Sequence, residues 1–401
     1  MTLVTRFFVK IFFFAESPFV SWEYETLALN LLAGKGYFYH IQGQDYYAYL
    51  PPLYAYFCFG IYKLFGHHPI IIIIFQCLFS SLLVVTVFYT TQMLFKNRFV
   101  AYLSALMTML HPGLLYYDII NLHPLSLGAL LIFLMGIVFI HLLRTLTPRW
   151  AMFYGLIAGL IFLERSVAAI FIGISLLILL FSAYRRKKTA IFLVTGVTAL
   201  LVIAPWMTRN TLKYGTLLVA NNGGLNFWKG NNPETNGSNF NDQGEAVLSK
   251  LIIQQKEKFR LYREKNELER DRFFWSEAFS YIQSDPIRYI KLFFKKLSSF
   301  VLMPTSIAGV LYSASQRLSL SIWYGFISFF LIFTLILHCF KKNQIPKDFH
   351  VYILLFVCFA VTHSLFYFEG RHRVPTDLIL ILYLSQGVNF LRLKLAVQKG
   401  I

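Results

Sequence analysis

Charged side chains are scarce in this sequence. Asp, Glu, Lys and Arg make up 14% of the 401 residues, whereas hydrophobic residues make up 57%. A typical soluble domain carries about 25% charged residues, so this chain has too few charges to cover a surface in water. The composition therefore excludes an ordinary soluble domain and predicts an integral membrane protein.

Cysteine is also rare, with only four residues in the chain. None belongs to a C-x-x-C pair and each stands in an apolar stretch, so the pattern supports neither a disulfide framework nor a zinc site. We expect small buried side chains at these positions. The sequence also has no nucleotide-binding loop, no appended soluble domain and no marked internal repeat.

Acidic residues are few, with 19 Asp and Glu against 37 Lys and Arg, which gives a net charge of +18. The basic residues fall in every second connector between apolar stretches: 96–98, 144–149, 185–188, 341–347 and 392–394. The positive-inside rule places such connectors in the cytoplasm. The charge thus predicts topology, and binding to nucleic acid is the weaker interpretation. The other connectors would face the exoplasmic side, and we expect a multi-pass protein of a bacterial inner membrane.

Long stretches without Asp, Glu, Lys or Arg predict the spans themselves. The longer stretches are 69–95, 121–143, 166–184, 189–208, 318–340 and 349–368, and shorter candidates are 100–117, 150–163 and 375–391. A helix needs about 20 apolar residues to cross the hydrocarbon, so the chain predicts an all-α, polytopic bundle of about nine to eleven spans.

The spans divide one membrane domain, 1–401, into segments. We expect a first exoplasmic loop at 16–69, transmembrane helices at 70–205, an exoplasmic loop with amphipathic helices at 206–317, and C-terminal transmembrane helices at 318–401. Helical spacing of apolar residues in 206–317 predicts one amphipathic helix within 245–272 and another at 281–297.

The first loop has the pattern of two short helices at the membrane surface. Glu25, Leu27, Ala28, Leu31 and Leu32 have helical spacing before Gly34, and a second helix would run from Pro51-Pro52 to Gly66. Glu23 and Glu25 flank Tyr24 at the start of the first helix. This segment is too polar to cross the membrane.

Several different motifs are distributed along almost the whole chain. The first loop contains Tyr24-x-x-x-Ala28-x-Asn30-Leu31-Leu32-x-Gly34-x-Gly36-Tyr37 and Pro51-Pro52-Leu53-Tyr54, and later motifs are GLIFLERS (159–166), APWMTRN at the start of 204–237, SEAFSYIQSDPIRYIKLFFKKL (276–297) and EGRHRVP (369–375). In this order they resemble the GT-C glycosyltransferases that use polyprenyl-phosphate sugars. These enzymes include protein O-mannosyltransferases and aminoarabinose lipid A transferases, and the chain resembles glycosyltransferase family 39 among them.

The resemblance implies a membrane enzyme that moves a sugar, with inversion, from a polyprenyl-phosphate carrier to a hydroxyl acceptor at the exoplasmic side. Membrane lipid, the lipid-linked donor and the acceptor would be its partners, with no nucleic acid; the oligomeric state stays open. The sequence indicates no cofactor and leaves a divalent cation open, because Asp118, His123, Glu164 and Asp242 could meet in space although no local spacing demands it.

Guanidinium groups predict where the donor phosphate would bind. Arg165, Arg209, Arg371 and Arg373 stand at outer helix ends, where the positive-inside rule disfavours them, and guanidinium binds phosphate oxygens in a bidentate way. The alternative for each is pairing with a carboxylate or extension into lipid headgroups.

The general base is less clear, because the family has an Asp four residues before its motif tyrosine and this chain has Val20 there. Glu23 is the nearest carboxylate and the candidate base, with Glu25 and Glu16 as weaker substitutes. Glu23 could instead be a solvated acid at a helix start. Val20 therefore keeps open a catalytically impaired, lipid-sugar-binding relative; a lipid or sugar transporter is the weakest alternative, since the spans hold few ionisable residues.

Contacts to sugar or acceptor are predicted mainly from the Asn/Gly tract at 221–237. Trp and Asn suit a site where a sugar face stacks and its hydroxyls are hydrogen-bonded, although a flexible loop with an interfacial tryptophan has the same composition. His123 replaces a carboxylate of the family's motif and could bind phosphate or acceptor, or be a satisfied helix-start residue. The predicted contacts are Tyr24, Asn222, Trp228, Asn231 and His123.

Overall fold

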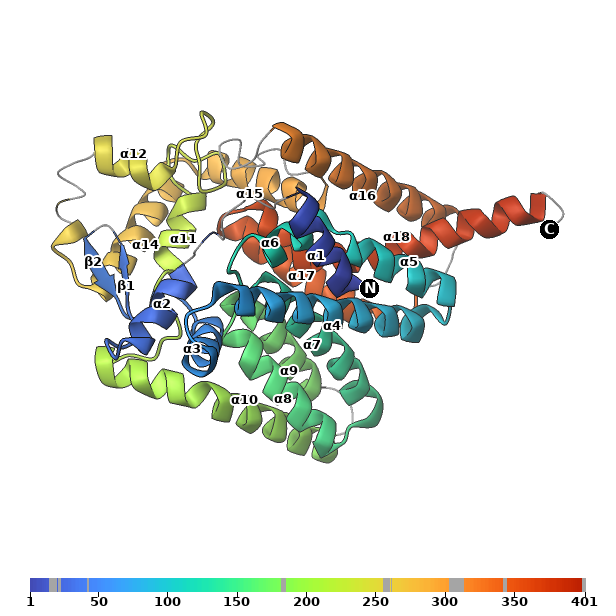
Figure 1. Cartoon of the computed structure of the whole chain (residues 1–401), viewed down its shortest axis with the longest axis horizontal. Helices are drawn as coiled ribbons and strands as arrows, with labels where there is room; N and C mark the ends of the chain where they lie inside the picture. Colours follow the sequence, from blue (N-terminus) through green and yellow to red (C-terminus); the bar gives the residue numbers. More distant parts are fainter. Residues whose placement is uncertain are drawn as a thin grey trace.

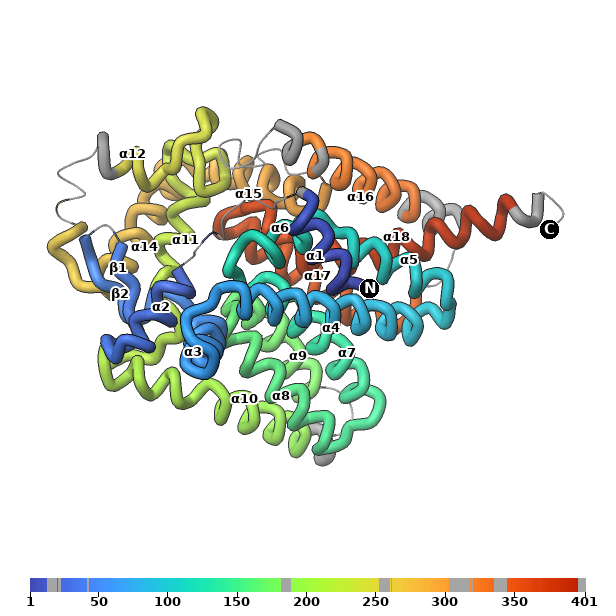
Figure 2. Tube along the Cα trace, viewed as in Figure 1, coloured from blue at the N-terminus to red at the C-terminus, as the bar shows by residue number. Residues whose placement is uncertain are grey.

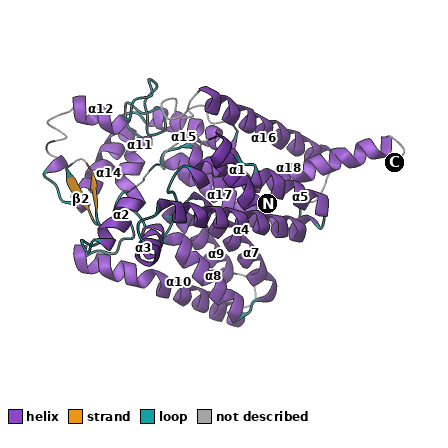
Figure 3. Ribbon diagram, in the orientation of Figure 1, coloured by secondary structure: helices purple, strands orange, loops and turns teal. Residues whose placement is uncertain are grey.

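The computed structural model describes residues 1–13, 20, 23–41, 43–181, 185–254, 260, 262–302, 314–341 and 345–398. Nearly all regular structure in these ranges is helical (Figure 3), which confirms the predicted all-α class. The helices are α1 (Thr2–Phe13), α2 (Glu23–Leu32), α3 (Leu53–Phe65), α4 (Pro69–Phe95), α5 (Arg98–Met109), α6 (Pro112–Ile119), α7 (Leu125–Thr145), α8 (Pro148–Phe162), α9 (Ala169–Phe181), α10 (Arg185–Tyr214), α11 (Gly223–Gly230), α12 (Val247–Gln254), α14 (Glu267–Ser284), α15 (Pro286–Val301), α16 (Ala314–Lys341), α17 (Phe349–Leu365) and α18 (Gly370–Gln398).

The long apolar helices form a bundle. Among the described residues, four helices are long and apolar enough to cross a membrane: 69–95, 125–145, 189–214 and 370–395. The pair α5 and α6 counts as a fifth if its 46° bend lies within one span, and shorter apolar helices such as α8 and α17 accompany them. A polytopic membrane protein is confirmed, while the number of nine to eleven spans stays a prediction.

Figure 1 shows how this bundle is arranged. Helix α4 crosses the middle of the view, α7 to α10 lie on one side of it, and α16 to α18 lie on the other. The short helices α2, α11, α12 and α14 gather at one end of the molecule, away from the C-terminus, as the tube in Figure 2 also shows. The polar segments 23–65 and 215–284 therefore form a cap on one end of the bundle.

Helices α8 and α10 pack closely because glycines face the contact. A Cβ atom at Gly155 would lie 2.5 Å from the carbonyl oxygen of Thr195, and one at Gly159 would lie 2.7 Å from Cβ of Val202. Small residues let helix backbones approach in a lipid environment, where dispersion contacts take the place of the hydrophobic effect.

The bend between α5 and α6 is held by a buried ion pair. Pro112 cannot donate a backbone hydrogen bond, so the helix breaks there and leaves carbonyl groups of the preceding turn without helical partners. Arg6 of α1 donates to the Met109 carbonyl oxygen and to Ser80 Oγ, and its Nε lies 2.9 Å from Asp118 Oδ2. Arg6 and Asp118 thus stabilise the bend.

The cap contains one element that we did not expect. Strands β1 (Tyr39–Ile41) and β2 (Gln44–Tyr46) form an antiparallel hairpin between α2 and α3. Three-residue strands give too short an alternating pattern to be recognised in a sequence. The predicted stop after the first helix is present, since α2 ends at Leu32 and Gly34 has a φ of +70°, a conformation that favours glycine.

The two amphipathic helices predicted in 245–297 are wrong in their boundaries. Asn266 caps a new helix, α14, through a capping box with Glu269, so 245–272 is divided between α12 and α14. Asp285 then caps α15 by accepting from the Arg288 amide, and Pro286 occupies its first turn. Capping residues outweighed apolar periodicity at both points.

Candidate functional site

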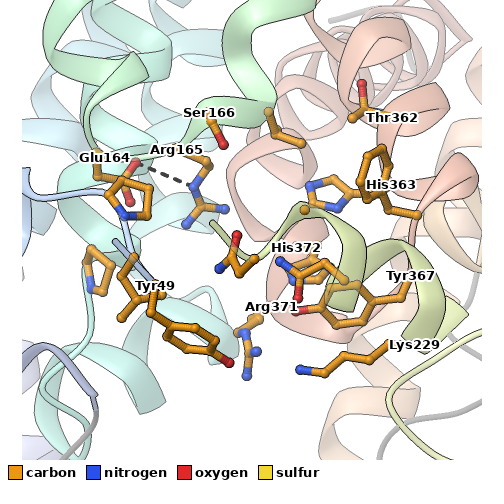
Figure 4. A pocket seen from close by; sticks show the side chains of 18 of the residues that line it. Tyr49, Glu164, Arg165, Ser166, Lys229, Thr362, His363, Tyr367, Arg371 and His372 are labelled. Carbon is orange, nitrogen blue, oxygen red and sulfur yellow. Dashed lines mark ion pairs between the residues drawn. The ribbon is translucent and has the colours of Figure 1, made fainter. Parts of the chain in front are cut away.

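A cavity of about 520 Å³ opens where the cap meets the bundle. It is lined by the start of α2, residues 49–51 and 123–124, the turn 164–170, α11, the end of α17 and the start of α18. Figure 4 shows its charged side chains converging from these separate elements. Among the predicted site residues it brings together Glu23, Tyr24, His123, Arg165, Asn222 and Arg371.

Cationic groups reach this cavity from separate parts of the chain. Arg165 Nε lies 3.5 Å from Glu164 Oε2, and Arg371 Nη2 lies 2.6 Å from Glu369 Oε2. Lys229 enters from α11, and burial lowers the pKa of its ammonium while Glu369 opposes that effect. The cavity thus holds positive charge that carboxylates partly balance, an arrangement suited to one phosphodiester anion.

Two carboxylates line the same cavity in different environments. Glu164 is buried, and burial raises the pKa of its carboxyl group against the opposing effect of Arg165. Gly128 makes room for it, because a Cβ atom there would lie 2.7 Å from Glu164 Oε2. Glu23 begins α2 and is only partly buried. Of the two, the less buried Glu23 is the better candidate for the base.

Aromatic and imidazole groups complete the wall. Burial lowers the pKa of His123 well below its usual range, with Arg371 and Arg165 adding to the effect, so its ring is neutral. Burial raises the pKa of the Tyr24 phenol, which remains a hydrogen-bond donor. Both groups suit sugar hydroxyls better than a second anion.

The comparison with protein families bears on this cavity. Residues 50–208 match the family described as dolichyl-phosphate-mannose-protein mannosyltransferase. The predicted resemblance to the GT-C glycosyltransferases is confirmed. No curated protein matches the chain. His123, Glu164 and Arg165 of the cavity belong to the matched segment. Glu23, Lys229 and Arg371 also line the cavity but lie outside the matched segment.

Two predicted phosphate ligands lie elsewhere in the described structure. Arg209 donates to the carbonyl oxygens of Tyr47, at 2.6 Å, and Tyr37, at 3.1 Å, and its guanidinium lies over the Trp206 ring. It fastens the first loop to α10. Arg373 is fully buried beside Asp377 and away from the cavity lining. Arg373 follows the alternative interpretation, pairing with a carboxylate, whereas Arg209 follows neither interpretation because backbone carbonyl oxygens hold it.

Glu25, the second candidate base, points away from the cavity into the contact between α2 and α3. Its carboxylate accepts from the Tyr62 hydroxyl at 2.7 Å and lies 3.0 Å from Nε2 of His67. Glu16, the remaining substitute, lies outside the described residues. Glu23 is therefore the predicted base that the described structure brings to the cavity.

Trp228 and Asn231 are absent from the cavity lining. Trp228 is buried against Phe274, with ring centroids 5.2 Å apart. The Asn231 amide donates to the carbonyl oxygens of Phe227 and Leu365 at 2.8 and 2.9 Å. Both residues hold α11 in place, and neither contacts the open space.

Lys229, adjacent to Trp228, is a cavity residue that sequence reasoning missed. Asn222, Asn226 and Lys229 all line the cavity and follow helical spacing, so they share one face of α11. This helical spacing is present in the sequence, but the Asn- and Gly-rich composition of the tract favoured its tryptophan as the sugar contact. Tyr367, His363 and His372 were also missed, because they come together only through tertiary packing, and Glu164 was considered only as a possible metal ligand.

A buried lysine fixes the elements that carry these residues. Lys296 of α15 donates to the Gly230 and Phe366 carbonyl oxygens at 3.2 and 2.7 Å and to Asn231 Oδ1 at 3.0 Å. These oxygens belong to the ends of α11 and α17, where the helix dipole is negative. Lys296 thus ties together two cavity walls without contacting the cavity.

Val20, where the family has its aspartate, is held beside the segment before His123. Its amide donates to the Ile120 carbonyl oxygen at 2.9 Å, and its own carbonyl oxygen accepts from Leu122 at 3.3 Å. Its side chain is absent from the cavity lining. The four residues that the sequence left open as a possible metal site are divided: His123 and Glu164 line the cavity, whereas Asp118 pairs with Arg6 and Asp242 lies near Lys295. The described residues contain no group of three metal-ligating side chains.

Proposed function

We propose that the protein is a GT-C glycosyltransferase that moves a sugar from a polyprenyl-phosphate carrier to a hydroxyl acceptor at the exoplasmic side. The family match supports the general reaction, a transfer from a polyprenyl-phosphate sugar. The observation that carries the proposal is the cavity, in which Arg165, Lys229 and Arg371 surround the same space as Glu23.

The cationic groups hold the donor phosphate in this proposal. Guanidinium and ammonium groups form strong charge-assisted hydrogen bonds to phosphate oxygens, and they stabilise the extra negative charge that develops as the phosphate leaves. Arg371 and Lys229 are taken as the principal ligands because they lie together on one side of the cavity (Figure 4), although Arg371 is paired with Glu369 as Arg165 is with Glu164.

Glu23 activates the acceptor. Its carboxylate takes the hydroxyl proton while the acceptor oxygen forms a bond to the anomeric carbon. The bond between that carbon and the phosphate oxygen breaks, and its electron pair leaves with the polyprenyl phosphate. Attack opposite the leaving group inverts the anomeric configuration. Tyr24, Asn222 and His123 hydrogen-bond the sugar or the acceptor, and the step needs no cofactor.

The position of the cavity supports an exoplasmic reaction. The C-terminal ends of α4, α7 and α18, which lead into or carry basic residues, lie far from α2 and α11 (Figure 1). Since basic connectors mark the cytoplasmic side, the opposite end bearing the cavity faces outward. We further propose that this membrane is the inner membrane of a bacterium.

The test is transfer by the purified full-length protein in lipid nanodiscs, with a panel of polyprenyl-phosphate hexoses and pentoses. Glu23→Gln removes the proton acceptor but keeps the shape, so we expect turnover to fall at least about 100-fold while donor binding stays unchanged. Glu25→Gln is the matched comparison and should retain transfer. Full activity in Glu23→Gln, or loss only in Glu25→Gln, would overturn the assignment of the base.

A second candidate is a relative that binds lipid-linked sugar without transferring it. The observation that favours it is Val20 in place of the family's aspartate. Wild-type protein that binds a donor in the same panel but yields neither transfer nor hydrolysis, and gains activity on Val20→Asp, would establish this alternative. Transfer by the wild type excludes it.

A further inference from the structure

His363 lines the cavity opposite the acidic residues but has no part in the proposed transfer. It lies in the last turn of α17, and its side chain is only 8% exposed. Its Nε2 atom is buried and has no hydrogen-bond partner among the residues that the structure describes. A buried polar atom without a partner is destabilising, so the position calls for a polar group that binds there.

The His363 ring is also held in one orientation. It stacks on the His372 ring at 4.3 Å between centroids with an interplanar angle of 18°, and on the Phe300 ring at 5.8 Å and 17°. In Figure 4 the imidazole is directed from α17 toward the open centre of the cavity. The two stacking contacts hold the plane of the ring, and the residue lines the cavity, so a ligand there meets the edge of the imidazole.

We propose that Nε2 of His363 hydrogen-bonds a hydroxyl group of the sugar carried by the lipid-linked donor. An imidazole nitrogen is a donor in one tautomer and an acceptor in the other, and a hydroxyl group can pair with either. The inference rests on the proposed function for the identity of the ligand, and it names the chemical group that this wall recognises.

A hydroxyl fits this wall better than the donor phosphate does. Figure 4 shows Lys229 and Arg371 together on one side of the cavity, while His363 and Thr362 lie on another. The phosphate would remain with the cationic side, because charge-assisted hydrogen bonds are roughly twice as strong as neutral ones. The sugar, joined to that phosphate, then extends toward the imidazole.

The experiment combines substitutions with deoxygenated donors. His363→Phe keeps an aromatic ring for stacking and removes both nitrogens, and His363→Gln restores a polar group. The probes are a polyprenyl-phosphate hexose that the wild type uses and each of its monodeoxy analogues. His350→Phe is the control, since His350 is an exposed histidine of the same helix, beside the Lys347 carbonyl oxygen. Thermal unfolding and gel filtration confirm that each variant is folded.

We expect His363→Phe to lower kcat/KM about tenfold with the complete donor, a loss typical of one neutral hydrogen bond. With the monodeoxy donor that lacks the hydroxyl bound by His363, the variant and the wild type should have equal kcat/KM. Each other analogue should lower the kcat/KM of both proteins by the same factor. His363→Gln should recover part of the loss, and His350→Phe should match the wild type.

The outcomes separate the two proposals. If the wild type transfers sugar and His363→Phe loses the same factor with every deoxy donor, or loses nothing, the hydroxyl contact is wrong and the glycosyltransferase stands. If the wild type binds donors without turnover, dissociation constants replace kcat/KM in the same comparison. If the wild type neither binds nor transfers any donor, the proposed function fails and the inference falls with it.

Discussion

Arg371 and Arg373 stand two residues apart at the start of α18 and meet opposite surroundings. Arg371 lines the cavity beside Glu369, whereas Arg373 is fully buried and donates to Asp377 Oδ1 at 2.7 Å and to the Leu302 carbonyl oxygen at 2.8 Å. A helix turns about 100° per residue, so positions i and i+2 face nearly opposite directions. One arginine of the motif is available to a ligand and the other braces the fold.

The same division separates the other cations. Arg209, Arg373 and Lys296 each donate to at least two backbone carbonyl oxygens, and so each joins segments that are distant in sequence. Arg371 and Arg165 lie beside carboxylates at the cavity instead. Fixed internal acceptors therefore mark a cation that braces the structure, and position at an outer helix end does not distinguish the two kinds.

Removing the bracing arginine gives the largest expected effect. Arg373→Ala removes the arginine from the buried Asp377 and leaves it the His111 ring, 3.3 Å from Oδ2; breaking one partner of a buried pair typically costs about 3–5 kcal/mol. We expect a large fall in the yield of folded protein and in its unfolding temperature, measured in detergent and in nanodiscs.

A double variant sharpens this test. Arg373→Met combined with Asp377→Leu removes both charges, so it should recover much of the stability that Arg373→Ala loses. An Arg373→Ala protein with wild-type stability would show that the distinction between bracing and cavity arginines is mistaken.

Removing the cavity arginine should reverse the pattern. Arg371→Ala is expected to lower kcat/KM by about 100- to 1000-fold, the range seen when one group that stabilises a developing charge is lost. Its unfolding temperature should change far less than that of Arg373→Ala. Arg371→Lys should retain part of the activity, because it keeps the charge without the bidentate geometry. Full transfer by Arg371→Ala would remove its phosphate role.

The long helices could be predicted from the sequence because their signal is local. The uncharged stretch 69–95 coincides with α4, and 349–368 contains α17. A chain in lipid must satisfy its backbone hydrogen bonds within each span, so an apolar run of this length has few alternatives to a helix. Boundaries failed at the capping residues Asn266 and Asp285, at Pro112, where the predicted span 100–117 is broken, and at Arg185, where α10 begins inside a predicted connector.

The site was predictable only in part, because the sequence marks outer helix ends but does not say what faces them. Arg165 and Arg371 reach the cavity, but Arg209 donates to carbonyl oxygens that flank the hairpin, an element whose short strands carry no clear pattern. The Glu25 carboxylate accepts a hydrogen bond from the hydroxyl group of Tyr62, which belongs to a different helix. Which of several similar side chains is left for a ligand depends on such distant partners.

Lys295 and Lys296 repeat the comparison with adjacent residues and give the smallest predicted effect. Lys295 is half exposed, 3.8 Å from Asp242, whereas burial lowers the pKa of Lys296 to about 7. The pKa of a lysine in the unfolded chain is about 10.4. Between pH 7 and pH 10 the unfolded chain therefore binds a proton that the folded chain has released. The free energy of unfolding should therefore increase with pH in this window, by at most about 1.4 kcal/mol per pH unit.

The pH dependence can be assigned by exchanging each lysine. Lys296→Met should abolish the increase in unfolding free energy between pH 7 and pH 9.5, measured by denaturant titration in mixed micelles, while Lys295→Met should retain it. Because Lys296 joins the ends of α11 and α17, Lys296→Met should also raise KM for the donor more than it lowers kcat. An equal pH dependence in both variants would mean that the buried ammonium is not titrating, and an unchanged KM would mean that α11 holds Lys229 in the cavity without it.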